Sequence, residues 1–113
     1  MKIKFHPNNI IEITDDSIII NEIDDALSLL FAHNCSGIIV KKENVTPDFF
    51  DLSTGLAGEI LQKCSNYNVK IAIVGDYTNI TSKPLNDFIR ESNSRRQILF
   101  VPATEAALRI FGG

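Results

Sequence analysis

The sequence predicts a single α/β domain, residues 1–113, with a mixed sheet that combines an N-terminal hairpin and parallel strands crossed over by helices. Short apolar runs of strand length alternate with longer segments whose apolar residues recur every three or four positions. Strands that are connected through helices lie parallel in one sheet, with right-handed crossovers. The chain also has the length of one ordinary domain, and it contains no linker and no internal repeat.

The first elements expected are a hairpin and a helix. Ile3–Phe5 and Ile10–Ile13 are short alternating runs separated by a turn that contains proline and paired asparagines. Ser17–Ile20 is expected to be an extended lead-in to the helix. Asn21 is expected to cap this helix, because acidic residues follow in its first turn, where the helix dipole favours them. The face expected to be buried consists of Ile23, Leu27, Leu30 and Phe31.

Strands and helices alternate over the next part of the chain. Gly37–Val40 is a continuous apolar run, which is typical of a strand covered on both faces, and residues 41–47 are polar. The spacing predicts a helix over Thr54–Tyr67 with Cys64 on its apolar stripe, and a second central strand over Val69–Val74. Gly55 and Gly58 each lower helix propensity, which suggests close approach of a backbone or ligand, or tight packing against the sheet.

The last elements are a helix, a strand and a short closing helix. Ser82 precedes Lys83-Pro84, and proline is favoured in the first turn of a helix. Ile98–Val101 predicts the last strand, and Thr104 is expected to cap the closing helix.

Composition and motifs argue against several classes of function. Fourteen acidic residues against 11 basic ones give a net charge of −3, which argues against a nucleic-acid-binding surface. No apolar run approaches the ~20 residues that span a bilayer, and the first residues lack the apolar stretch of a signal peptide. We therefore expect a cytoplasmic protein without membrane contact. The sequence contains no known catalytic signature and no metal-ligand spacing, so we expect no catalytic residue, metal or cofactor.

The candidate site lies where strands end and helices begin. In open α/β sheets, ligands collect at the carboxyl ends of the strands, beside helix N-termini. Lys41-Lys42 and Gly75-Asp76 follow two strands, and Asp51, Ser53, Thr54 and Gly55 form the turn before a helix. Ser53, Thr54 and Asp76 are therefore expected to be neighbours. Helix capping by the two hydroxyls, and turn formation by Asp76, are the purely structural alternatives.

The turn resembles a motif of the STAS domains of anti-sigma factor antagonists, which carry Asp-Ser-Ser-Gly-Leu between a strand and a helix. Here Asp51–Leu56 matches with one extra residue. In that family a partner kinase phosphorylates the serine two residues before the glycine, which switches binding off, and this position corresponds to Ser53. Over nearly its whole length the chain resembles still more closely a bacterial family of domains of unknown function. The shared segments are Phe49–Leu52, Gly75-Asp76 and Ser82–Asn93.

These observations favour a non-enzymatic regulatory or protein-interaction domain that binds a regulatory protein partner and is switched by phosphorylation at Ser53 or Thr54. The alternative is a small-molecule-binding domain or a hydrolytic enzyme that uses Ser53, Thr54 and Asp76. A homodimer is a further alternative, because an exposed edge strand near the N-terminus is able to pair with another copy.

Overall fold

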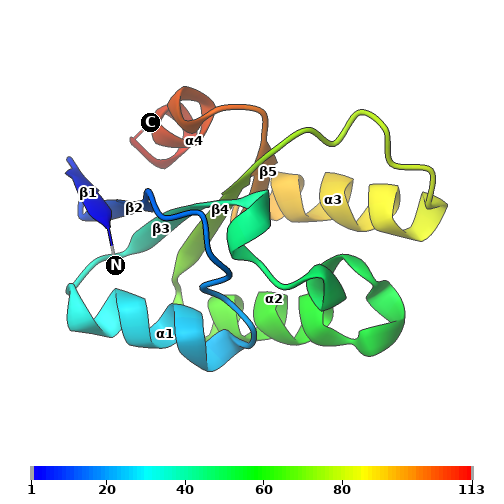
Figure 1. Ribbon diagram of the computed structural model, residues 1–113, viewed down its shortest axis with the longest axis horizontal. Coiled ribbons are helices and arrows are strands. Elements are labelled where there is room, and N and C mark those ends of the chain that lie inside the picture. The colour runs from blue at the N-terminus through cyan, green and yellow to red at the C-terminus, as the bar shows by residue number, and fades with distance from the viewer. Residues whose placement is uncertain (1, 113) are drawn as a thin grey trace.

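Five strands form one sheet in the order β1-β2-β3-β4-β5 in the computed structural model, which describes residues 2–112 (Figure 1). β1 and β2 are antiparallel, and the pairs from β2 to β5 are parallel. The prediction of an α/β domain with an N-terminal hairpin and parallel strands is confirmed. The strands span Ile3–His6, Ile10–Ile13, Gly37–Lys41, Lys70–Val74 and Ile98–Val101.

The helices cover the two faces of the sheet unequally. Alternate strand residues, such as Ile38 and Val40 of β3, form one large core with α1, α2 and α3, whereas Ile39 belongs to a smaller core beneath α4. Figure 1 shows α4 on the opposite side of the sheet from α1 and α2. Burial on both faces explains why the central strands are continuous apolar runs. The helices are α1 (Ile23–Ala32), α2 (Leu56–Tyr67), α3 (Lys83–Arg95) and α4 (Thr104–Gly112).

The start of α1 differs from the expectation by one residue. Glu22, rather than Asn21, is the N-cap, and it forms a capping box with Asp25. The Asp25 carboxylate accepts hydrogen bonds from the backbone N–H groups of Asn21, at 2.8 Å, and Glu22, at 3.2 Å. An aspartate inside the first turn of the helix therefore satisfies the backbone N–H groups of the two residues that precede the helix.

The predicted buried face of α1 is correct at Leu27 and Leu30 and wrong at Phe31, which is 64% exposed. Phe31 lies about 100° further round the helix than Leu30, and its ring packs edge-on against Tyr67 with 6.2 Å between the centroids. The side chain of Ile23 lies outside the described part of the structure. Cys64 is fully buried, as predicted, and burial raises the pKa of its thiol to about 12.

The polar segment after β3 contains a buried asparagine that organises the chain around it. Asn44 is fully buried, and its side chain makes three hydrogen bonds to backbone groups. Its Oδ1 accepts from the N–H of Lys41, and its Nδ2 donates to the carbonyl oxygens of Asp15 and Ser17, all at 2.8–2.9 Å. This amide therefore ties the extended lead-in to the end of β3.

Candidate functional site

Three short 3-10 turns connect β3 to α2: η1 (Lys42–Asn44), η2 (Pro47–Phe50) and η3 (Leu52–Thr54). The four residues Asp51, Ser53, Thr54 and Gly55 are all exposed here. Asp51 caps η3, because its Oδ1 accepts from the Ser53 backbone N–H at 3.1 Å and from the Ser53 hydroxyl at 2.6 Å. Ser53 thus presents an exposed hydroxyl that is oriented by a neighbouring carboxylate.

Thr54 has a structural role in the same turn. Its Oγ1 lies 2.8 Å from the carbonyl oxygen of Asp48 and 2.9 Å from that of Asp51, and one hydroxyl proton serves both. The same oxygen accepts from the backbone N–H of Leu56 at 3.3 Å, at the start of α2. Thr54 therefore fastens η2 and η3 to the helix, which is the capping alternative considered for it from the sequence.

The helix predicted over Thr54–Tyr67 begins two residues later, because Gly55 adopts a left-handed conformation with φ = 78° and becomes the N-cap of α2. A side chain at this φ is strained, and this backbone conformation explains the glycine. A Cβ added at Gly55 or Gly58 meets nothing within 4 Å. The expectation of a close backbone or of tight packing against the sheet at these two glycines is therefore wrong.

A buried aromatic residue holds the turns against the core. Phe49 in η2 is only 1% exposed. Its ring lies 5.1 Å from that of Phe50 and 6.1 Å from that of Phe100 in β5, measured between centroids. The position of Ser53 therefore depends on an anchor four residues earlier in the chain.

Asp76 occupies an equivalent turn after β4. Its Oδ1 accepts from the Thr78 backbone N–H at 3.0 Å and from the Thr78 hydroxyl at 2.6 Å, the same arrangement that Asp51 makes with Ser53. Each aspartate thus bonds the hydroxyl residue of its own turn. The hollow beside Asp76 is lined by neither Ser53 nor Thr54, so the structure does not gather these three residues into one pocket.

Lys42 bridges the two turns. Its Nζ lies 5.4 Å from the ring centroid of Phe50 and 5.3 Å from that of Tyr77, within the range of cation–π attraction. A Cβ at Gly75 would lie 3.0 Å from the Cβ of Lys42, so the glycine leaves space for the lysine. The sequence pattern placed Lys42 and Gly75-Asp76 at the same edge of the sheet, but it gave no signal for the two rings.

The family is decided by a match over most of the chain. A family model described as a domain of unknown function, DUF4180, matches residues 5–110. The chain belongs to the DUF4180 family. No curated protein and no solved structure matches the chain.

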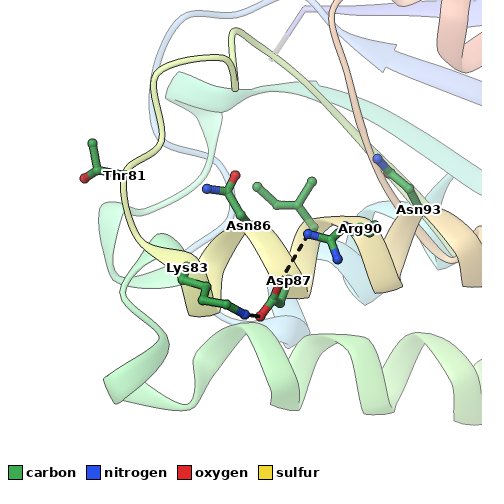
Figure 2. Close-up of a pocket in the computed structure, with 7 residues that line it drawn as sticks. Thr81, Lys83, Asn86, Asp87, Arg90 and Asn93 are labelled. Carbon is green, nitrogen blue, oxygen red and sulfur yellow. Dashed lines mark hydrogen bonds and ion pairs between the residues drawn. The ribbon is translucent and has the colours of Figure 1, made fainter.

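The DUF4180 domain carries two adjoining hollows that the sequence analysis missed. One, of about 440 Å³, lies beside Asp76 and is lined by side chains that include Tyr77, Phe100 and Pro102. The other, of about 800 Å³, lies along α3, and both hollows are lined by Ile89 and Asn93. Figure 2 shows the second hollow, where the cationic side chains of Lys83 and Arg90 both reach the Asp87 carboxylate, at 2.8 and 3.2 Å.

Among residues 2–112, no helix is both long enough and apolar enough to cross a membrane. The same residues contain no group of three or more His, Cys, Asp or Glu side chains arranged to hold a metal ion.

The Asp51 carboxylate gives a direct test of the turn geometry of the DUF4180 domain. Hydrogen bonds from the Ser53 hydroxyl and then from its backbone N–H lower the pKa of Asp51. Because the pKa of Asp51 is lower in the folded state than in the unfolded state, its ionised carboxylate stabilises the folded protein at any pH above the unfolded-state pKa. This stabilisation is lost as the pH falls through the folded-state pKa. We expect Ser53→Ala to raise the pKa of Asp51 toward its usual value.

Carboxyl carbon chemical shifts measured through an acid titration report this pKa directly. Asp76 is the internal control, because hydrogen bonds from Thr78 lower its pKa in the same way. Ser53→Ala is expected to leave Asp76 unchanged, and Thr78→Ala is expected to shift Asp76 alone. An Asp51 titration that Ser53→Ala does not move would contradict the hydrogen bonding described for this turn.

Proposed function

We propose that this domain is a non-enzymatic, protein-interaction domain with a regulatory role, of the type of the anti-sigma factor antagonists, and that phosphorylation of Ser53 switches its binding. The observation that carries the proposal is the exposed Ser53 hydroxyl on the turn between β3 and α2. The mixed sheet with its N-terminal hairpin is the architecture expected for a STAS-like domain. Ser53 is better suited than Thr54, whose hydroxyl already bonds two carbonyl oxygens.

The charges around Ser53 indicate how a phosphate acts there. A phosphoserine carries about −1.5 to −2 charges at neutral pH. The Ser53 oxygen is 2.6 Å from the Asp51 carboxylate, and Asp48 and Glu59 belong to the flanking turns. Like charges repel at this distance, so the phosphate displaces Asp51 from the cap of η3. The switch therefore combines a remodelled turn with a more negative surface, which weakens the binding of an acidic partner.

The proposal predicts that Ser53→Asp removes a partner that the unmodified protein binds. Tagged wild-type protein, Ser53→Ala and Ser53→Asp are used to capture proteins from the cells that naturally produce the domain, and the captured proteins are quantified by mass spectrometry. We expect at least one partner to fall about tenfold with Ser53→Asp, which corresponds to ~1.4 kcal/mol of binding free energy, and to remain with Ser53→Ala.

Ser28→Asp is the matched control, since Ser28 is also exposed and lies on the outer surface of α1. This variant adds the same charge and is expected to keep every partner. A partner set that is identical for wild type and Ser53→Asp argues against the switch.

The hollow beside Asp76 favours a second candidate function, binding of a small molecule. Its volume of about 440 Å³ falls within the range of ligand pockets, and its lining is mainly apolar with the Asp76 carboxylate among the polar groups. A ligand that binds only the folded state raises the unfolding temperature. Thermal-shift screening against nucleotides, phosphates and lipids tests this candidate. Shifts that disappear in Asp76→Ala support it, and the absence of any shift argues against it.

A further inference from the structure

The two edges of the sheet are finished differently. β5 is one edge, and the side chain of Asn93 in α3 closes it. The Asn93 Oδ1 accepts from the backbone N–H of Phe100 at 2.7 Å, and its Nδ2 donates to the carbonyl oxygen of Phe100 at 3.3 Å. The amide thus takes the place of a neighbouring strand, and this edge is protected from pairing.

The other edge, β1, presents free backbone groups. The backbone N–H of Thr14 donates to the carbonyl oxygen of Lys2 at 3.0 Å, so the backbone polar groups of Lys2 point toward β2. The direction of these groups alternates along an antiparallel strand, so those of Lys4 point toward β2 as well. The N–H and C=O groups of Ile3 and Phe5 consequently point away from the sheet.

Exposed aromatic side chains accompany this edge. Phe5 is 68% exposed, and its ring lies 5.9 Å from that of His33 at the end of α1. Phe31 and Tyr67 are 64% and 52% exposed and pack against each other. β1 and the C-terminal end of α1 lie on the same side of the molecule (Figure 1). Exposed aromatic side chains therefore lie on the same side of the molecule as the open edge.

We propose that β1 pairs antiparallel with β1 of a second copy of this chain, with Phe5 on the two-fold axis. The two sheets then form one continuous sheet, and the Phe5 rings of the two copies meet between their His33 rings. A two-fold contact of this kind uses the same surface on both copies and forms a closed dimer. This inference is independent of the proposed switch at Ser53, which lies on a different connection.

The charged side chains of β1 favour the pairing in which Phe5 lies opposite Phe5 of the second copy. Residues that face each other across an antiparallel pair have side chains on the same face of the sheet. In a two-fold pair, the axis therefore runs between a residue and the same residue of the second copy. An axis at Lys4 would place the two Lys4 side chains directly opposite, and like charges there are destabilising. An axis at Phe5 instead places Lys4 opposite His6 of the second copy. Within each copy, His6 Nε2 is 2.8 Å from the Glu12 carboxylate. His6 of the second copy therefore brings the negative charge of its Glu12 near Lys4.

The size of the surface sets the strength of the dimer. Aromatic side chains of this kind offer on the order of 150–250 Å² each, so the exposed parts of Phe5, Phe31 and Tyr67 amount to roughly 400 Å² per copy. Specific interfaces bury about 1,200–2,000 Å² in total, and smaller ones belong to weak or transient complexes. We therefore expect a concentration-dependent dimer with a Kd on the order of micromolar or weaker.

Sedimentation velocity from about 1 µM to about 1 mM tests the proposal, because this range spans the expected Kd. Wild-type protein is expected to shift from monomer to dimer, and Phe5→Glu is expected to remain monomeric. Phe5 is largely exposed, so this variant keeps the fold, which circular dichroism verifies. Ile18→Glu is the matched control, since Ile18 is 50% exposed but lies outside β1, and it is expected to dimerise as the wild type does.

Cross-linking in a Cys35→Ser background tests the register. Directly opposed residues of a hydrogen-bonded pair have Cα atoms about 5.5 Å apart, which suits a disulfide. Phe5→Cys is expected to form a covalent dimer on mild oxidation, and Lys4→Cys is expected to remain unlinked. Cross-linking by Lys4→Cys alone overturns the Phe5-centred pairing. A monomer at every concentration, or a dimer that Phe5→Glu leaves intact, overturns the proposal.

Discussion

Replacing Phe49 by alanine is expected to lower the free energy of unfolding by about 4 kcal/mol, because a buried aromatic ring is lost and a cavity remains. Phe49 is 1% exposed and lies among the rings of Phe50 and Phe100. Domains of this size have a total stability of about 5–15 kcal/mol, so the loss is a large share of it. Urea denaturation with a two-state fit measures the change.

The same substitution is expected to loosen the turn that carries Ser53. Phe49 fixes η2, and Thr54 ties η2 to η3 through the Asp48 carbonyl oxygen. Phe31→Ala is the control, since this ring is 64% exposed and its loss is expected to cost less than about 1 kcal/mol. Equal losses for the two variants would contradict the assignment of Phe49 as the anchor of the turn.

Replacing Asn44 by alanine is expected to cost about 3 kcal/mol and to lower the melting temperature by roughly 10 °C. The Asn44 side chain bonds one backbone N–H and two carbonyl oxygens in a fully buried position. Alanine leaves these three groups without their partner, and each unsatisfied buried group costs about 1–3 kcal/mol. Part of this cost is recovered where water reaches Asp15, which is half-buried.

Differential scanning calorimetry measures this effect. Asn79→Ala serves as the control, because Asn79 lies exposed in the loop between β4 and α3 and its replacement is expected to change stability by less than about 0.5 kcal/mol. Asn44→Asp is a second test, since it keeps the acceptor for the Lys41 N–H but loses the two donors. A stability loss for Asn44→Ala no larger than that of Asn79→Ala would show that the amide does not hold the lead-in segment.

The sheet was predictable from sequence because its signal is local and strong. Continuous apolar runs predict buried parallel strands, and the proline and paired asparagines predict the hairpin. The exposure of Phe31 was not predictable, because helical spacing alone does not show which apolar side chains of a helix the neighbouring elements cover. Tyr67, which packs against it, lies far away in the sequence.

The exposed turn before α2 was predictable from the sequence, but its shape was not. The acid, hydroxyl and glycine sequence correctly indicated an exposed turn before a helix, but it did not show that Leu52–Thr54 forms a separate 3-10 turn. Backbone hydrogen bonds from Thr54 to Asp51 and from Gly55 to Leu52 close this turn, and α-helical spacing does not distinguish it from the first turn of α2. The role of Asn44 was missed because a polar residue in a polar segment carries no sign of burial.

The turn geometry gives the proposed switch a physical basis. Ser53 is exposed, yet its hydroxyl contributes to the cap of η3, so a modification at this oxygen changes the turn as well as the surface charge. Phe49 is fixed by a ring contact with Phe100 that a phosphate on Ser53 does not touch, whereas Thr54 bonds the carbonyl oxygen of Asp51, the residue that the phosphate displaces. The expected change is therefore confined to η3 and the start of α2, which leaves the sheet and its β1 edge intact.

Phosphate occupancy at Ser53, determined by peptide mass spectrometry on the protein purified from the cells that naturally make it, tests the regulatory proposal most directly. The account predicts that the peptide spanning this turn carries phosphate on Ser53 in growing or in resting cells, with Thr54 unmodified. A turn peptide that is free of phosphate in both states would contradict it.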